Sequence, residues 1–354
     1  MTELLVGTKK GLFALEGEPG APFTVTARAF AGEPVEYAMR DPATGRAIAS
    51  VTSAFYGPKL WWADDPAGPW RQAEGVALPE GGEEALKRIW VVVAGEEGTL
   101  YAGGDPGVLF ESRDGGASWE LNRALWEHPT RPDWSPGGGG LCLHSIAPWP
   151  GEPGRLALAM SAVGVWLTDD GGRTWRHGNA GLHPGYLPDD VPQDTLQLCV
   201  HDLQRSPVRP ERLFLQFHGG VYRSDDAGAS WTSIAAGLPS DFGFPLAVDP
   251  ADPDSAYVIP LSADTDRVTP EGRVRVYETR DAGATCTARG AGLPDRDAYL
   301  TVLREAFDRA GEGGALELYF GCTSGEVFAS GDAGATWSTA APRLPPVYSV
   351  RTAP

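Results

Sequence analysis

The stretch "GGVYRSDDAGASW" at residues 219–231 joins a short apolar strand to a tight polar turn that ends in a tryptophan. This turn, called the box from here on, recurs as "SRDGGASW" at 112–119, "TDDGGRTW" at 168–175, "SDDAGASW" at 224–231, "TRDAGATC" at 279–286 and "SGDAGATW" at 330–337. An eroded copy, "ADDPAGPW", occupies 63–70. The box aspartates at 65, 114, 170, 226, 281 and 332 follow one another at intervals of 49, 56, 56, 55 and 51 residues. That interval fits one four-stranded unit per repeat.

The residues of the box have a structural rationale. Serine or threonine at its first position and aspartate at its third can bond to backbone amides of the turn, and glycine at its fifth permits a positive φ. The closing tryptophan offers an apolar face that pins the turn on its own sheet. We therefore expect structural roles for the box aspartates, which are Asp114, Asp170, Asp226, Asp281 and Asp332.

A seventh unit is divided between the two ends of the chain. The segment "LLVGTKKGLFAL" at 4–15 has the strand, glycine turn and strand of the other units but lacks a first strand. The last segment, "VYSVRTAP" at 347–354, is a first strand with no unit after it. Pairing the two would close a ring and remove its open edges. The sequence thus predicts an all-β fold, a seven-bladed β-propeller forming a single domain over residues 1–354.

Composition and charge exclude several classes of partner. The 46 glycines and 31 prolines among 354 residues suit many short strands joined by turns. A net charge of -18 argues against nucleic acid and against an anionic membrane surface, and no apolar run is long enough to span a bilayer. The four scattered cysteines do not form a disulfide framework, and together with the N-terminal sequence they favour a cytoplasmic location.

The boxes resemble the Asp-box, or BNR, repeat (Ser-x-Asp-x-Gly-x-Thr-Trp) of sialidases, sortilin-type receptors, some xyloglucan hydrolases and photosystem II assembly factors. Beyond them, "RPDWSPGGGGLCLHSI" at 131–146, "LPSDFGFPLAV" at 238–248 and "LPPVYSVRTA" at 344–353 are similar to uncharacterised bacterial WD40/YVTN/BNR-like propellers labelled glycosyl hydrolase or exo-sialidase-like. The resemblance covers essentially the whole chain and implies the propeller fold. It implies a hydrolase activity less directly, because one fold hosts many functions.

A true sialidase activity is not expected. Sialidases hold the substrate carboxylate with three arginines, one of them in a "[FY]RIP" motif, and pair a tyrosine with a glutamate as nucleophile. The nearest match here is "KRIW" at 87–90, which lacks both the aromatic residue and the proline. The sequence indicates no second and third arginine that would accompany Arg88 at the channel mouth.

The first strand of each propeller blade lines the central channel, and its beginning lies on the face opposite the boxes. Alignment of the first strands on endings such as "MRDP", "APWP", "QRSP" and "AVDP" gives one position at the channel mouth, occupied by Glu36, Arg88, His144, His201, Phe244, Leu300 and Tyr348. Titratable groups that converge in a concave site predict a ligand site. We take Glu36, Arg88, His144 and His201 as candidate catalytic residues. The alternative is a chance polar cluster in a wet channel mouth.

Two of these histidines belong to a repeated Cys-x-His motif. "CLH" at 142–144 and "CVH" at 199–201 lie one repeat apart, and alternate residues of a strand point to the same side. Cys142, His144, Cys199 and His201 are therefore candidate ligands for a transition metal such as Zn²⁺. The alternative is that the cysteines only fill space in the core.

Loops expected on the mouth face add candidate ligand-binding residues, since long loops in a short-looped fold are often functional. With Phe244 and Tyr348 of the mouth, they are His128, Arg131, Trp134, Asp189, Asp190, His218 and Asp241. Aromatic rings among carboxylates suit a glycan or related small molecule, and Glu36 with Asp189, Asp190 or Asp241 would supply the two carboxyl groups of glycoside hydrolysis. Two other functions stay open: a non-catalytic protein-binding or assembly module, and a metal-dependent enzyme that uses the Cys-x-His pairs.

Overall fold

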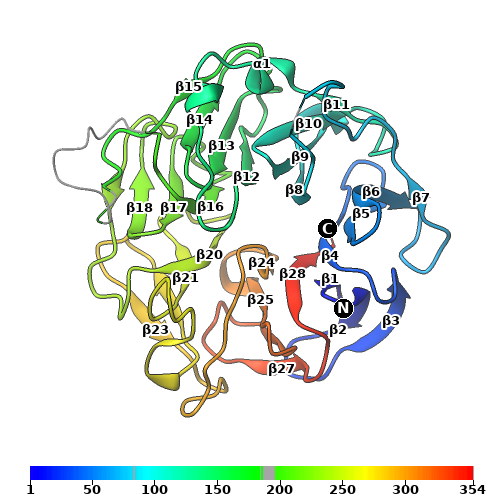
Figure 1. Cartoon of the computed structure of the whole chain (residues 1–354). Coiled ribbons are helices and arrows are strands. Elements are labelled where there is room, and N and C mark those ends of the chain that lie inside the picture. Colours follow the sequence, from blue (N-terminus) through cyan, green and yellow to red (C-terminus); the bar gives the residue numbers. More distant parts are fainter. Residues whose placement is uncertain (83, 184, 186–195, 354) are drawn as a thin grey trace.

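The computed structural model describes residues 1–82, 84–183, 185 and 196–353, and it forms seven four-stranded antiparallel sheets. Figure 1 shows these sheets arranged as blades around a central channel, in chain order from blue to red. Blades 1 to 6 are β4–β7, β8–β11, β12–β15, β16–β19, β20–β23 and β24–β27. Blade 7 has the order β28-β1-β2-β3, so the C-terminal strand completes the N-terminal sheet. The predicted seven-bladed all-β propeller and its closure are confirmed.

Each blade places its strands in sequence from the channel outward. The innermost strands are β4 (Val35–Arg40), β8 (Arg88–Ala94), β12 (Leu143–Pro148), β16 (Val200–Arg205), β20 (Gly243–Val248), β24 (Phe307–Ala310) and β28 (Val347–Thr352). The second strands are β5 (Ala47–Ser53), β9 (Leu100–Asp105), β13 (Leu156–Met160), β17 (Leu213–Phe217), β21 (Ala256–Pro260), β25 (Glu317–Gly321) and β1 (Thr2–Thr8).

The third and fourth strands form the outer half of each blade. The third strands are β6 (Gly57–Ala63), β10 (Val108–Ser112), β14 (Gly164–Thr168), β18 (Gly220–Ser224), β22 (Val276–Thr279), β26 (Val327–Ser330) and β2 (Gly11–Gly17). The outermost strands are β7 (Arg71–Gln72), β11 (Glu120–Leu121), β15 (Arg176–His177), β19 (Thr232–Ser233), β23 (Thr287–Arg289), β27 (Ser338–Ala341) and β3 (Thr24–Ala29). The helical elements are α1 (Arg123–Trp126) and the 3₁₀ turns Glu96–Gly98, Arg131–Asp133, Pro270–Gly272 and Gly313–Ala315. No helix in the described part of the chain is long and apolar enough to cross a membrane.

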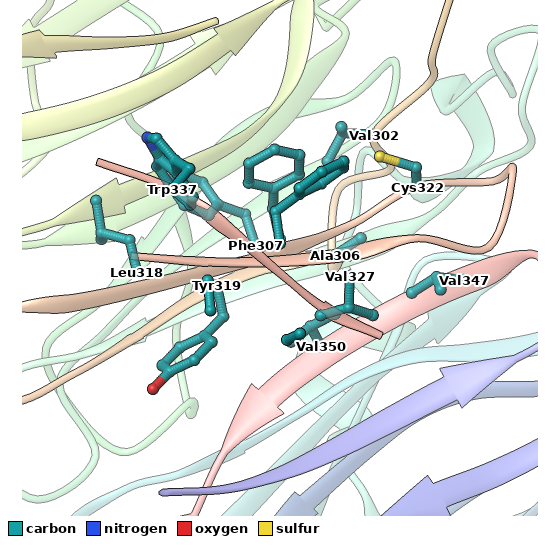
Figure 2. Close-up of a cluster of buried hydrophobic side chains, with 14 of the residues drawn as sticks. Val302, Ala306, Phe307, Leu318, Tyr319, Cys322, Val327, Trp337, Val347 and Val350 are labelled. Atoms are coloured by element: carbon teal, nitrogen blue, oxygen red, sulfur yellow. The ribbon is translucent and has the colours of Figure 1, made fainter. Parts of the chain in front are cut away.

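The core lies between neighbouring blades. Figure 2 shows the cluster around blade 6, where Phe307, Leu318 and Trp337 meet Val347 and Val350 of β28. All five side chains are at least 95% buried, so the strand that closes the ring is also packed against the blade before it. Burial of this size contributes about 1.5–3 kcal/mol for each large apolar side chain.

The boxes adopt the turn that their sequence predicts. In the box of blade 4, the Ser224 hydroxyl accepts a hydrogen bond from the Gly228 amide (2.9 Å), and the Asp226 carboxylate accepts from the amide and hydroxyl of Ser230 (2.8 and 2.6 Å). Gly228 has the expected positive φ of 91°, and Ala227 before it also has a positive φ, of 66°.

The box tryptophan does more than pin its own sheet. The Trp231 indole donates to the Gly178 carbonyl and the Trp231 amide donates to the Ala180 carbonyl, both at 2.8 Å and both in the loop after blade 3. The same amide link joins Trp119 to Glu74 and Trp337 to Ala291. The repeated turn therefore bonds consecutive blades to one another.

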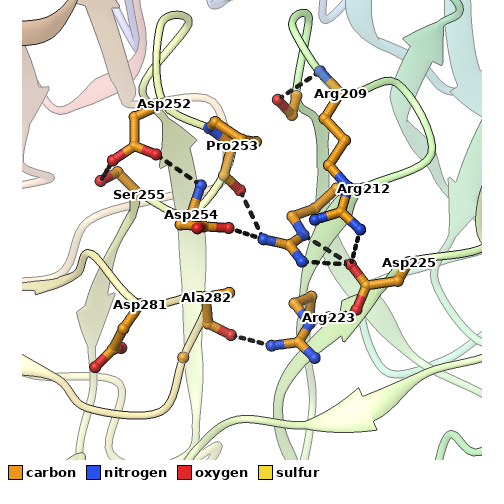
Figure 3. A network of polar contacts seen from close by, with 12 residues as sticks. Arg209, Arg212, Arg223, Asp225, Asp252, Pro253, Asp254, Ser255, Asp281 and Ala282 are labelled. Atoms are coloured by element: carbon orange, nitrogen blue, oxygen red, sulfur yellow. Dashed lines mark hydrogen bonds and ion pairs between the residues drawn. The ribbon is translucent and has the colours of Figure 1, made fainter.

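Ion pairs on the same face reinforce these links. Figure 3 shows Arg212 between Asp225 of the blade 4 box and Asp254 of blade 5, while Arg223 donates to the carbonyl of Ala282 (2.6 Å). The Arg212 guanidinium is almost completely buried. Asp225 thus pairs with the two arginines that reach blade 5, whereas Asp226 bonds within the turn of its own box.

Candidate functional site

The innermost strands share an irregularity at the channel mouth. In five blades the innermost strand has one extra residue that pairs with no residue of the second strand. In β20 two residues, Phe244 and Pro245, lie opposite a single residue of β21. The extra residues of the five blades are Glu36, Trp90, His144, His201 and Tyr348. A bulge leaves one residue unpaired and re-aims its side chain. The mouth position predicted from the strand endings is this ring of bulges.

Two members of the predicted ring are placed differently. In β8 the bulged residue is Trp90, and Arg88 lies two residues earlier, although its side chain still reaches the mouth. Leu300 lies outside β24, in a loop, and its backbone carbonyl accepts a hydrogen bond from the Thr269 amide. Arg304 and Glu305 approach the channel from blade 6 instead. The sequence at 303–311 resembles a helical turn, so the alignment put the innermost strand of blade 6 near Leu300, whereas β24 begins at Phe307.

A cavity of about 660 Å³ opens at the mouth. It is lined by Glu36, Arg88, Trp90, Ser135, Pro136, Gly137, Gly138, Gly139, Ser161, Ala162, Gln197, Cys199, His201, His218, Phe244, Asp264, Arg267, Leu303, Arg304, Glu305 and Tyr348. We call this the mouth pocket. Seven sequence-predicted residues are brought together in it, namely Glu36, Arg88, Cys199, His201, His218, Phe244 and Tyr348.

An acid and a base face each other on one wall of the mouth pocket. Arg88 Nε lies 3.2 Å from Glu36 Oε1, and the Glu36 side chain is 4% exposed whereas that of Arg88 is 40% exposed. Burial raises the pKa of Glu36, and the positive charge of Arg88 offsets only part of that rise. Burial, together with the negative charge of Glu36, raises the pKa of Tyr348. Glu36 is therefore a buried carboxyl group whose protonated form is favoured relative to that of an exposed glutamate.

Arg304 lies deeper in the mouth pocket. Its guanidinium carbon is 4.8 Å from the ring centre of Phe244 and 5.9 Å from that of Trp90. Its Nε atom is buried without a hydrogen-bond partner, and within the described residues its guanidinium forms no ion pair. Burial lowers the pKa of Arg304, although an arginine stays charged at neutral pH. With Arg88 and Arg267, the pocket holds three arginines, which corrects the expectation that Arg88 has no companions.

The floor of the mouth pocket is a buried polar network. Glu305 lines the mouth pocket and also a second channel cavity of about 700 Å³ on the box side. Its carboxylate pairs with Arg351 of β28, and burial raises the pKa of Glu305 against the opposing effect of that arginine. Burial likewise raises the pKa of Asp202 to about 6. The floor thus joins the site to the strand that closes the ring.

A cysteine and two histidines stand together on blade 4. One ligand atom each of Cys199, His201 and His218 lies within 4.8 Å of the other two. His201 Nδ1 lies 2.6 Å from the carbonyl oxygen of Gly243, and burial lowers the pKa of His201 well below 6.5, so the ring is neutral with its proton on Nδ1. His218 Nε2 lies 3.6 Å from Asp264 Oδ2. Burial raises the pKa of Cys199.

The other predicted metal ligands lie elsewhere. His144 is buried with its Nε2 3.0 Å from the Ser161 hydroxyl, and it lines the cavity on the box side. Cys142 Sγ donates to the Gly139 carbonyl (3.3 Å). The described residues therefore contain a Cys-His-His group in place of the predicted pair of Cys-x-His motifs.

Several predicted ligand-binding residues do not reach the mouth pocket. His128, Arg131 and Trp134 line a separate cavity of about 550 Å³, where Arg131 stacks 3.7 Å above the Trp126 ring. Asp241 is exposed outside the mouth pocket. The predicted residues Asp189 and Asp190 lie outside the described residues.

Sequence reasoning missed Trp90, Ser161, Gln197, Arg267, Arg304 and Glu305 as pocket residues. Arg304 and Glu305 could have been found by counting strand lengths back from the blade 6 box to the start of β24. Arg267 and Asp264 come from the loop after β21, and the unusual length of that loop was the only sequence feature that indicated them.

Comparisons with known proteins show the fold alone. Neither a family model nor a curated protein sequence matches the chain. Similar solved structures include a putative 6-phosphogluconolactonase from Bacteroides uniformis (TM-score 0.60, 13% identity, 99% of each chain covered) and an ancestral GH74 enzyme (TM-score 0.58, 16% identity, 90% of this chain and 38% of that chain). Another is YCF48 bound to D1 peptide (TM-score 0.53, 12% identity, 94% of this chain and 85% of that chain). The chain is thus a propeller similar in fold both to enzymes and to a peptide-binding protein, and it spans well under half of the GH74 enzyme.

Proposed function

We propose that the protein is a hydrolase that takes a small, negatively charged sugar or sugar-like molecule in the mouth pocket. The observation that carries this proposal is the guanidinium of Arg304, which has no ion pair among the described residues and lies near the rings of Trp90 and Phe244 in a cavity that Glu36 also lines. The volume of about 660 Å³ suits a ligand of this size.

Arg304 would anchor the ligand. A buried charge without a partner is costly, and a carboxylate or phosphate would satisfy the guanidinium through two parallel hydrogen bonds. Trp90 and Phe244, which also line the pocket, offer flat apolar faces against which a sugar ring can pack. Such an anchor favours charged glycans over neutral ones.

Glu36 would act as the general acid. Burial raises the pKa of Glu36 and so favours its protonated form, which can donate a proton to the leaving oxygen as the bond to carbon breaks. Arg88, 3.2 Å away, then stabilises the carboxylate that remains. A water molecule adds to the carbon and loses its proton to a base, for which Asp264 is the pocket's exposed carboxylate.

The test compares Glu36→Gln with Glu33→Gln, a substitution three residues earlier and outside the mouth pocket. Both proteins and the unaltered chain are assayed against chromogenic glucuronides, a chromogenic sialoside, neutral glycosides and sugar lactones. We expect turnover of a carboxylate-bearing substrate, a loss of about 10²–10⁴-fold in kcat for Glu36→Gln and no change for Glu33→Gln. No turnover across the panel, or equal turnover by Glu36→Gln, would contradict the proposal.

One observation favours a protein-binding function as a second candidate. Phe55 and Tyr56, at the tip of the β5–β6 hairpin on the mouth face, are 89% and 80% exposed. Exposed aromatic residues mark binding surfaces, and the net charge of -18 favours a basic partner. The test is binding of labelled lysine-rich peptides, which Phe55→Ser with Tyr56→Ser should abolish and Glu36→Gln should not.

A further inference from the structure

Cys199, His201 and His218 converge through the pairing of β16 with β17. Val200 pairs with Phe217, so the residue before β16 and the residue after β17 lie opposite each other. The His218 amide donates to the Cys199 carbonyl (3.0 Å), which fixes the two backbones together. His201 comes to the same place because the bulge of β16 turns its side chain toward the mouth. The main chain therefore brings all three side chains together.

The surroundings of His201 prepare it to bind a cation. Its Nδ1 proton is held by the Gly243 carbonyl at 2.6 Å, which leaves the lone pair on Nε2. A hydrogen bond from the second ring nitrogen to a backbone carbonyl is the usual support of a metal-bound histidine. Phe242 and Phe244 hold the ring, with centroids 5.3 and 4.9 Å away.

The spacing of the three donors is close to that of a metal site. Ligands of a tetrahedral zinc ion lie about 3.4 Å apart, given metal–ligand bonds of roughly 2.0–2.3 Å. The three donor atoms here lie within 4.8 Å of one another, and rotation of the half-buried Cys199 and His218 side chains can close the difference. The His218 side chain is 27% exposed and stands on the turn between β17 and β18.

We propose that Cys199, His201 and His218 bind a single transition-metal ion, with zinc as the best match, on the blade 4 wall of the mouth pocket. A thiolate and two imidazoles form a borderline-soft donor set, which suits Zn²⁺ and Co²⁺ and not Mg²⁺ or Ca²⁺. Binding forms one bond from each donor atom and releases the Cys199 thiol proton to solvent. Asp264, whose Oδ2 lies 3.6 Å from His218 Nε2, would orient that ring.

Three protein ligands leave a coordination position that faces the cavity. A water molecule bound there would be acidified by the metal and become a nucleophile at neutral pH. That role rests on the proposed hydrolysis, whereas the binding of the ion does not.

The test is titration of the apo protein with Co²⁺, read by the thiolate-to-cobalt charge-transfer absorption, and metal content after dialysis against Zn²⁺. We expect one ion per chain with thiolate absorption, loss of that absorption in Cys199→Ser, and at least about tenfold weaker binding in His218→Gln. Two thiol controls, Cys286→Ser in the blade 5 box and Cys142→Ala, should bind as the unaltered protein does.

Each result decides something. A stoichiometry below one, or unchanged absorption in Cys199→Ser with a normal thermal melt, would overturn the site. Loss of absorption in Cys142→Ala alone would move the thiolate to blade 3 and equally overturn it. Glu36→Gln should keep the metal while losing turnover, so a failure of the hydrolase proposal is distinguishable from a failure of the metal site.

Discussion

Arg351 fastens the closing strand to both of its neighbours, and its replacement by methionine is a sharp test of the closure. From β28 its Nε donates to the Tyr37 hydroxyl of blade 1 (2.6 Å), and its Nη1 donates to the carbonyls of Glu305 and Phe307 of blade 6 (2.9 and 3.0 Å). Its Nη2 pairs with the Glu305 carboxylate. The guanidinium thus bridges three blades.

Removal of one partner of a buried ion pair costs about 3–5 kcal/mol, because the remaining group stays buried without compensation. Unfolding entropy is about 2.1 cal/mol/K per residue, so the 354 residues give about 0.7 kcal/mol/K. Arg351→Met should therefore lower Tm by about 4–7 °C. Replacement of Glu305 by glutamine as well removes the orphaned carboxyl, so the double variant should lose less than the sum of the single losses.

The assay is differential scanning calorimetry of Arg351→Met, Glu305→Gln and the double variant. Arg343→Met serves as the matched control, since Arg343 is exposed and precedes the same strand. The reasoning is refuted if Arg351→Met melts within 1 °C of the control, a limit of about 0.7 kcal/mol. Strict additivity of the two single variants would also refute it.

Three further predictions follow from the boxes and the mouth pocket. Gly181→Ala should destabilise the protein by about 1–3 kcal/mol in urea unfolding, because its φ is +84° and an added Cβ would lie 2.2 Å from the Trp231 carbonyl, whereas Gly314→Ala, with open space around it, should not. Hydrogen bonds from Thr174 lower the pKa of Asp170 to about 2, so its stabilisation is full above the ordinary value of 3.8 and is lost as pH falls through about 2. Asp170→Asn should accordingly lower Tm at pH 6 and leave it nearly unchanged below pH 2, and a parallel offset at all pH values would disprove the assignment. Arg304→Gln should bind Co²⁺ several-fold more tightly, because the Arg304 charge acts on both Cys199 and His201, and unchanged affinity would contradict that placement.

The repeat predicted the architecture because each box sets a distance along the chain. Box spacing fixed the blade count, and the unpaired first strand at 347–352 predicted the closure. From the sequence, the boxes were each expected to stabilise only their own blade. Their link to the preceding blade, such as Trp231 to Ala180, depends on how blades stack and has no local signature.

The mouth pocket was predictable only where an innermost strand ends in a recognisable way. Glu36, His201, Phe244 and Tyr348 were found by counting back from those endings. Arg304 was missed because blade 6 has no such ending and its strand is only four residues long. His218 was found as a loop residue, but its approach to Cys199 depends on the β16–β17 register, which the sequence left open.

The mouth pocket as an anion-binding ligand site is the central claim, and isothermal titration of glucuronate and gluconate into the protein tests it most directly. We predict binding that Arg304→Gln abolishes and that Arg273→Gln, a control at an exposed arginine paired with Glu271, leaves unchanged. Equal binding by the unaltered protein and Arg304→Gln, or no binding of either anion, would contradict the account.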